Sequence, residues 1–405
     1  MTVDSSVISR LKGFHFEPLR GDKEYLYGTN GRKLLDFQCG ISGHILGYNN
    51  NIVEKTIIQQ IQKGLFSQSD TFINNEKNEL TYRLCKHIGF CDKNNNINGT
   101  AVYFTSAIET NEYAIQIASK RYNTLCERNY NEIIVVGNIA NNSSDLNPTS
   151  FQPHNSSCTN IKEKIEIKYV EYNNLSNIED LITEHTSAVM LKPIDWKQGF
   201  TICDIKYMQS LRQLCSYHKI GLIIDETNIG IGYSGKMFIF QNYNIQPDII
   251  TLSTGLANGL PIAICITNEE FSKFLPNSPI NRQDNNMPIA VTNAIIKQIQ
   301  HSNIFANIDN YSRYIYETMI KIQHKYNDII KNIYVYGMIF AIQLQEPVKA
   351  QHLYTIILSN GLASVLTSAN TICFFPPLNI TQNNLMKSLY IIKHSVNEIT
   401  LLLKY

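Results

Sequence analysis

The chain has 405 residues, and 43% of them are hydrophobic, which is enough for a large core or for two subdomains. Its 35 lysines and arginines almost balance its 34 aspartates and glutamates, so no field of the whole chain attracts nucleic acid or an anionic membrane. The nine cysteines are scattered and never spaced as C-x-x-C, which is typical of reduced structural thiols and not of a zinc site or a disulfide framework.

The N-terminal residues lack the apolar core of a signal peptide, and no later run approaches about 18 uninterrupted apolar residues. We therefore expect a cytoplasmic protein with no membrane segment. Small molecules or other proteins are the expected partners.

The predicted elements begin with short extended segments between residues 24 and 47, where Gly28 to Gly31 is a hairpin signal. From residue 51, apolar residues at helical spacing open a stretch in which helices alternate with short apolar strands. These predicted strands are 102–104, 133–136, 188–191, 222–224 and 249–252. Strands separated by helices in this way predict a mainly parallel α/β sheet covered on both faces.

The C-terminal part predicts a helix over 304–325, strands within 333–344 and a final helix over 383–403. Three segments follow from this order of elements. Residues 1–50 and 304–405 form a small domain from both chain ends, and residues 51–303 form a large domain.

Two segments with special residues follow predicted strands. Residues 221–228 read Gly-Leu-Ile-Ile-Asp-Glu-Thr-Asn and precede a glycine-rich stretch at 230–238. Residues 247–261 read Pro-Asp-Ile-Ile-Thr-Leu-Ser-Thr-Gly-Leu-Ala-Asn-Gly-Leu-Pro. Together with collinear motifs over nearly the whole chain, they resemble the class-III aminotransferases of the ornithine and acetylornithine group, which use pyridoxal phosphate (PLP). The resemblance implies the PLP-transferase fold of type I, with a large domain, a smaller α+β domain and a homodimer.

Thr254 stands where the resemblance places the lysine that forms a Schiff base with PLP. A hydroxyl cannot form a Schiff base with an aldehyde, and it cannot accept a proton as an amine does. We therefore predict that the chain forms no internal aldimine and does not transaminate.

Asp225 matches the family's acid that pairs with the protonated ring nitrogen of the cofactor. A buried carboxylate at a strand end is costly unless it meets a cation, so Asp225 favours a preserved ring site, although it could equally organise the neighbouring backbone. Thr227 and Asn228 stand where the family has a valine on the ring face and a glutamine at the phenolic oxygen.

Residues 103–112 match the strand-to-helix turn whose Ser-Gly-Ala backbone holds the cofactor phosphate. Such a turn offers free N–H groups and a favourable helix dipole. Here it reads Ser106-Ala107-Ile108. Ala107 cannot adopt a glycine-only conformation, and Ile108 is bulkier beside an anion, so we expect Ser106 to act mainly as a helix cap.

Four further family features are missing. The aromatic residue that stacks on the ring aligns with 139–142, Ile-Ala-Asn-Asn, and the partner subunit's phosphate-binding threonine aligns with Gln283. The arginine that clamps the substrate carboxylate aligns with Cys373, and the glutamate that pairs with it aligns with Lys197. A thiol cannot replace a bidentate guanidinium, so we expect a changed substrate pocket.

Four residues are candidates for a catalytic role in the altered site. Lys192 follows a strand end and Lys197 lies close by, where a desolvated amine could act as base or nucleophile, or simply form a salt bridge. His44 lies in a loop that borders the family's active site and could be a general base or a packing residue. Cys373 could be a nucleophile or an inert buried thiol. Lys236 is expected to be an ordinary surface lysine.

Three hypotheses result. The main one is a pseudoenzyme without cofactor, a homodimer or a heterodimer with an active relative. A second is a cleft that performs PLP-independent chemistry on a small-molecule ligand. The alternative is an enzyme that holds PLP or pyridoxamine phosphate (PMP) non-covalently, with Asp225 at the ring nitrogen.

Overall fold

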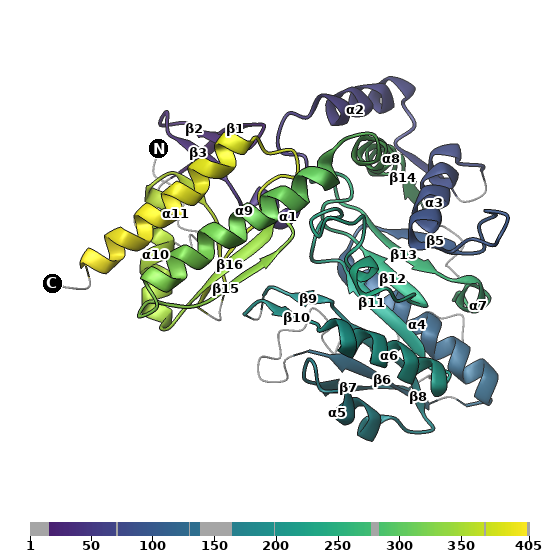
Figure 1. Ribbon diagram of the computed structural model, residues 1–405. Coiled ribbons are helices and arrows are strands. Elements are labelled where there is room, and N and C mark those ends of the chain that lie inside the picture. The colour runs from purple at the N-terminus through teal and green to yellow at the C-terminus, as the bar shows by residue number, and fades with distance from the viewer. Residues whose placement is uncertain are drawn as a thin grey trace, which may run out of the picture.

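The computed structural model describes residues 16–69, 72–128, 130–137, 164–197, 199–276, 283–367 and 370–402. Figure 1 shows a larger unit built around one wide sheet and a smaller unit that contains both ends of the chain. The long helix α9 (Ile304–Lys325) extends from the neighbourhood of α8 (Asn286–Gln300) along the smaller unit.

The large sheet has seven strands in the order β5-β13-β12-β11-β8-β6-β7. Neighbouring strands are parallel except at β13, which is antiparallel to both β12 and β5. The strands are β5 (Thr100–Phe104), β6 (Tyr130–Val136), β7 (Lys164–Val170), β8 (Thr186–Leu191), β11 (Gly221–Glu226), β12 (Ile249–Leu252) and β13 (Ala263–Thr267). The predicted α/β class and mainly parallel sheet are therefore confirmed.

Both faces of this sheet are covered. Helix α4 (Ala107–Cys126) packs Ala114, Ile117 and Ala118 against strand residues such as Ile223 on one face. On the other face, helix α6 (Ile205–Tyr217) packs Leu211 into the main core, where α3 (Asn75–Ile88) also lies. Every residue of β8, β11 and β12 is buried, which explains why their sequences are almost continuously apolar.

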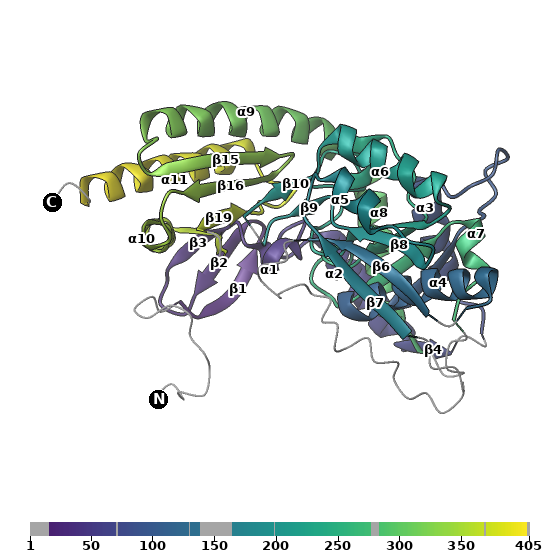
Figure 2. The same cartoon turned by 90° about the horizontal axis from the view of Figure 1, so that it is seen from below.

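The smaller unit joins the two chain ends. Strands β1 (Pro18–Asp22), β2 (Tyr25–Gly28) and β3 (Lys33–Asp36) form a sheet with β17 (Leu362–Ala363), and Leu35 of β3 pairs with Leu362. A second sheet has the order β15-β16-β19-β18. Its strands are β15 (Ile330–Tyr336), β16 (Ile339–Leu344), β18 (Val365–Leu366) and β19 (Thr371–Phe374). Helices α9, α10 (Pro347–Ser359) and α11 (Gln382–Leu402) pack beside these sheets (Figure 2).

Short elements complete the described chain. Strand β4 (Ser67–Ser69) pairs with β14 (Gln283–Asn285), and β9 (Ile194–Asp195) pairs with β10 (Thr201–Ile202). The remaining helices are α1 (Cys39–Ser42), α2 (Asn51–Lys63), α5 (Leu175–Leu181), η2 (Ile239–Tyr243) and α7 (Glu269–Ser272). Among the described residues, no helix combines the length and the apolar character that crossing a membrane requires.

Candidate functional site

Asp225 lies near the end of β11, at the edge of the large sheet where the parallel strands finish. Its side chain is only 2% exposed. One carboxylate oxygen, Oδ1, accepts hydrogen bonds from the Thr227 backbone N–H at 2.8 Å and from the Thr227 hydroxyl at 2.6 Å. A carboxylate so deeply buried needs such donors, so the local chain is built around the acid.

Helix α4 supplies the next contact. The amide of Asn111 donates to Asp225 Oδ2 at 2.9 Å, and its oxygen accepts from the Thr251 hydroxyl at 2.6 Å. Asn111 therefore connects α4 with two adjacent strands, because Asp225 and Thr251 are paired in the β11–β12 register. No role for Asn111 was predicted from the sequence. An amide at helical spacing from the apolar Ala114, Ile115 and Ala118 is the signal that could have revealed it.

Lys192 immediately follows β8, the strand on the other side of β11. Its Nζ lies 4.0 Å from Asp225 Oδ2, and its side chain is 16% exposed. The predicted strand-end position thus brings an ammonium to the buried acid, at the carboxyl edge where ligands of parallel sheets bind.

Thr254 lies two residues beyond the end of β12 and is half-buried. Its backbone N–H donates to the Thr227 carbonyl at 3.1 Å. Gly255 then has a φ of +81°, and an added Cβ would lie 2.7 Å from the Gly230 Cα. The chain after β12 is therefore pressed against the chain after β11, which holds position 254 next to the Asp225 loop.

The first turn of α4 carries the predicted phosphate position. Ser106 is the N-cap of α4, and its hydroxyl accepts from the N–H groups of Ile108 at 3.2 Å and Glu109 at 3.5 Å. The capping role expected for Ser106 is confirmed. Ala107 is partly exposed, and Ile108 is 48% exposed, so the bulky side chain points away from the core.

The backbone carbonyl of Asn228 accepts two hydrogen bonds. One comes from the Trp196 indole N–H at 3.1 Å and the other from the Ser42 hydroxyl at 3.4 Å. Trp196 is buried and packs its ring edge-on to Phe375 of the smaller unit, with centroids 5.2 Å apart. No role for Trp196 was predicted from the sequence, and its indole joins the Asn228 backbone to the smaller unit.

Cys373 lies in β19, fully buried, with its thiol 3.8 Å from the Trp196 carbonyl. Burial raises the pKa of this thiol well above its usual range. A thiol held in the neutral form is a poor nucleophile, so these surroundings favour the inert alternative. The Lys197 ammonium lies 5.8 Å from the Trp196 ring centroid, on the same hairpin.

The ring of His44 lies between Gly40 and Gly259. A Cβ added to Gly40 would lie 2.7 Å from His44 Nδ1, and a Cβ added to Gly259 would lie 2.6 Å from Nε2. Its ring packs on Tyr48 with centroids 4.7 Å apart, and Nδ1 is buried with no hydrogen-bond partner within the described chain. Burial lowers the pKa of His44, so the imidazole is neutral at pH 7. Gly259 belongs to the loop that starts at Thr254.

Residues 139–142, where the stacking aromatic residue was sought, lie outside the described residues. For Gln283 the structure describes only the backbone, which pairs with Ser69, the last residue of β4. The prediction for its side chain is therefore untested.

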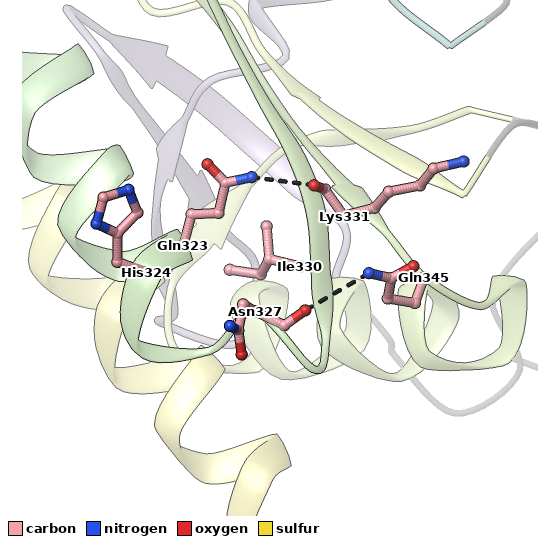
Figure 3. A pocket seen from close by; sticks show the side chains of 6 residues that line it. All are labelled: Gln323, His324, Asn327, Ile330, Lys331 and Gln345. Atoms are coloured by element: carbon pink, nitrogen blue, oxygen red, sulfur yellow. Dashed lines mark hydrogen bonds between the residues drawn. The ribbon is translucent and has the colours of Figure 1, made fainter.

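A separate hollow lies in the smaller unit, between the end of α9 and the start of β15. Figure 3 shows the amides of Gln323 and Gln345 bonded to the carbonyls of Lys331 and Asn327, at 3.0 and 3.5 Å. These side chains stabilise the turn between α9 and β15, and they assemble no acid, base or nucleophile against one another.

Residues 9–396 match the model of the class-III aminotransferase family. The chain belongs to the class-III aminotransferases. An acetylornithine aminotransferase of Clostridium acetobutylicum is 27% identical over 383 residues, covering 93% of this chain and 95% of the relative. A succinylornithine transaminase of Photorhabdus laumondii is 27% identical over 369 residues, covering 90% and 89%. The resemblance expected from the motifs is therefore confirmed.

Solved structures of this family share the fold. An acetylornithine aminotransferase of Elizabethkingia anophelis superposes with a TM-score of 0.81 at 21% identity, over 96% of both chains. An ornithine aminotransferase of Toxoplasma gondii gives 0.81 at 18% identity, over 98% of this chain and 94% of that one, and its structure reveals partial occupancy of PLP at the active site. The predicted type I fold is thereby confirmed.

The prediction of a site without cofactor is wrong. The family match and these relatives point to PLP. A site can bind a cofactor through several groups even when one bond to it is missing, so the changes at single positions do not exclude PLP.

The residues in this chain fit such a group. Asn111, which touches Asp225, is five positions from Ser106 on α4, or about 7.5 Å along the helix axis. One helix thus joins the buried acid to a helix N-terminus, and these are groups that suit a ring nitrogen and a phosphate. The buried Tyr172 hydroxyl also lacks a hydrogen-bond partner among the described residues, and burial, followed by the charge of Asp195, raises its pKa.

Proposed function

We propose that this chain is a class-III aminotransferase-family enzyme that holds PLP or PMP without a covalent bond. The observation that carries the proposal is the position of Thr254 beside the Asp225 loop, through its 3.1 Å bond to the Thr227 carbonyl. The resemblance assigns the family's lysine to this position, where the side chain is a hydroxyl. A hydroxyl can hydrogen-bond to a cofactor, and it cannot form an imine.

Asp225 is the expected anchor for the ring, because Asn111 and Thr227 fix its orientation before any ligand arrives. The N-terminal turn of α4 is the expected anchor for the phosphate. When bound, the cofactor would supply electron withdrawal from carbon atoms next to an amino group. The protein's contribution is then binding, orientation and proton handling.

Proton transfer requires a base other than Thr254. His44 is neutral and carries an unpartnered Nδ1 among the described residues, which makes it one candidate. Lys192, whose Nζ lies 4.0 Å from Asp225 Oδ2, is an ammonium there and is the expected proton donor. The buried thiol of Cys373 offers no clamp for a carboxylate, so we infer that the amino substrate is recognised differently from the family's arginine-bound substrates.

The test is the absorbance of purified protein after addition of PLP, followed by borohydride and desalting. We expect wild type to retain a PLP band before reduction and to carry no reduced adduct on position 254. Thr254→Lys should carry a borohydride-fixed adduct on residue 254, found by peptide mass mapping. Thr254→Ser is the matched control, since it keeps a hydroxyl and should behave as wild type.

Loss of all cofactor on desalting, in wild type and in Thr254→Lys alike, would contradict the proposal. A reduced adduct on another lysine of wild type would contradict its non-covalent part.

A further inference from the structure

The charge of Asp225 already has a counter-ion within the protein. The Lys192 Nζ lies 4.0 Å from Asp225 Oδ2, and the two side chains are 16% and 2% exposed. The two residues that donate hydrogen bonds to this carboxylate, Asn111 and Thr227, are neutral. Lys192 is therefore the cation that these contacts place beside the acid.

The Lys192 ammonium changes which protonation state of a cofactor ring Asp225 can bind. A carboxylate stabilises a protonated ring nitrogen because the two charges are opposite. With an ammonium at the same carboxylate, a protonated ring would bring a second positive charge into a buried site, where charges are weakly screened. The resemblance places a glutamate at position 192, which would have the reverse effect.

Lys192 also has the chemistry to accept the alternative form of the ring. An ammonium has three donors and no acceptor, so it can contact Asp225 and still donate to an unprotonated ring nitrogen. The side chain of Lys192 is long and partly exposed, which gives it the freedom to do so.

We propose that Lys192 is a specificity-determining residue that makes the site select a B6 phosphate with an unprotonated ring nitrogen. The proposal rests on the proposed function. It deepens that function because an unprotonated ring withdraws electrons less strongly than a protonated one. The site is then suited to reactions that need little carbanion stabilisation.

The experiment measures the Kd of PMP by equilibrium dialysis and the ring ¹⁵N chemical shift of labelled PMP at one fixed pH. The proteins are wild type, Lys192→Met, Lys192→Glu and the matched control Lys236→Met, at an exposed lysine. In wild type we expect the shift of an unprotonated nitrogen. In Lys192→Glu we expect the shift of a protonated nitrogen and a Kd at least tenfold lower, which corresponds to about 1.4 kcal/mol. Lys192→Met should lie between them, and Lys236→Met should match wild type.

A protonated nitrogen in wild type, or equal Kd values and shifts in wild type and both Lys192 variants, would overturn the proposal. Absence of PMP binding in every protein would overturn it as well, since Lys192 would not then be what decides binding. Binding by Lys192→Glu alone would support the role of Lys192 and would refute the proposed function of the native chain. Thermal unfolding of each variant checks that the fold is intact.

Discussion

Glu226 follows Asp225 directly on β11, but its surroundings differ. It is fully buried on the opposite face of the strand, and its oxygens accept the backbone N–H groups of Ile239 at 2.8 Å and Phe240 at 2.7 Å. Burial is the main cause that raises the pKa of Glu226 from 4.5 to about 7. Asp225 thus lies at the edge of the sheet where a ligand is expected, and Glu226 binds the backbone that follows the glycine-rich loop.

The raised pKa of Glu226 predicts how stability depends on pH. The folded protein binds this proton more tightly than the unfolded chain, so the contribution of Glu226 to stability is lost as the pH rises from about 4.5 to about 7. Relative to Glu226→Gln, wild type should lose about 1–3 kcal/mol of unfolding free energy between pH 5 and pH 8. Urea unfolding at both pH values measures this difference.

The exposed Glu179 on α5 provides the matched control, and Glu179→Gln should keep the wild-type pH dependence. If the stabilities of wild type and Glu226→Gln changed in parallel with pH, the proton would not belong to Glu226.

At the scale of elements, two loops form one unit beside the sheet edge. Residues 39–42 have positive φ angles of 45° to 61°, a rare conformation outside glycine. This turn presents the Ser42 carbonyl to the loop of Gly255, where an added Cβ would lie 3.0 Å from it. His44 fills the space between the two loops, so its ring is a spacer in addition to a candidate base.

The contact between His44 and Gly259 predicts a specific coupling. Gly259 has a φ of +103°, and a methyl group there would lie 2.6 Å from His44 Nε2. We expect Gly259→Ala to destabilise the protein by about 2–3 kcal/mol, from backbone strain and the collision with the ring. In a His44→Ala background the collision disappears, and the cost of the alanine should fall by about 1 kcal/mol.

A double-mutant cycle by denaturant unfolding measures this coupling. Gly64→Ala, at a positive φ of +69° with open space around it, is the control and should show the same cost in both backgrounds. An additive cycle for Gly259 would mean that the histidine can move aside freely.

At the scale of the whole molecule, Trp196 connects the two units. It belongs to the β9 hairpin of the larger unit, bonds to the Asn228 carbonyl and packs on Phe375 of the smaller unit. Its backbone carbonyl lies 3.8 Å from the thiol of the buried Cys373. Trp196 thus contacts both the chain after β11 and β19, and we interpret the changes at 197 and 373 as one adaptation.

The dimer expected from the resemblance stays a prediction, and an exposed apolar surface between α2 and α3 supports it. Leu65, Phe66, Phe72 and Ile73 are 59%, 51%, 69% and 82% exposed. Large exposed apolar patches mark interaction surfaces, and we propose that a second copy of this chain covers this one. A heterodimer with an active relative would use the same surface.

Ile73→Glu should convert the dimer into a monomer, since it buries a charge in an apolar interface. Sedimentation velocity at micromolar concentration measures the mass of both species. Val348→Glu, at an exposed apolar residue of α10, is the control and should remain dimeric. A monomeric wild type would contradict the homodimer.

The sequence by itself determined the elements whose pattern is local. Continuous apolar runs predicted β8, β11 and β12, and helical spacing predicted α9 over the same residues that it occupies. Two strands of the large sheet were not predicted. β7 alternates charged and apolar residues because it lies at the sheet edge, and β13 follows β12 without a helix because it runs antiparallel.

Tertiary structure alone decided the contacts of the site. Lys192 and Asp225 come from separate strands, and only the strand order β11-β8 brings the ammonium to the acid. Trp196 and Phe375 likewise meet through the packing of two units. Residue types and spacing along one strand or helix are visible in a sequence. The distance between side chains from different elements depends on how those elements pack, which is why the counter-ion of Asp225 appeared only in the folded protein.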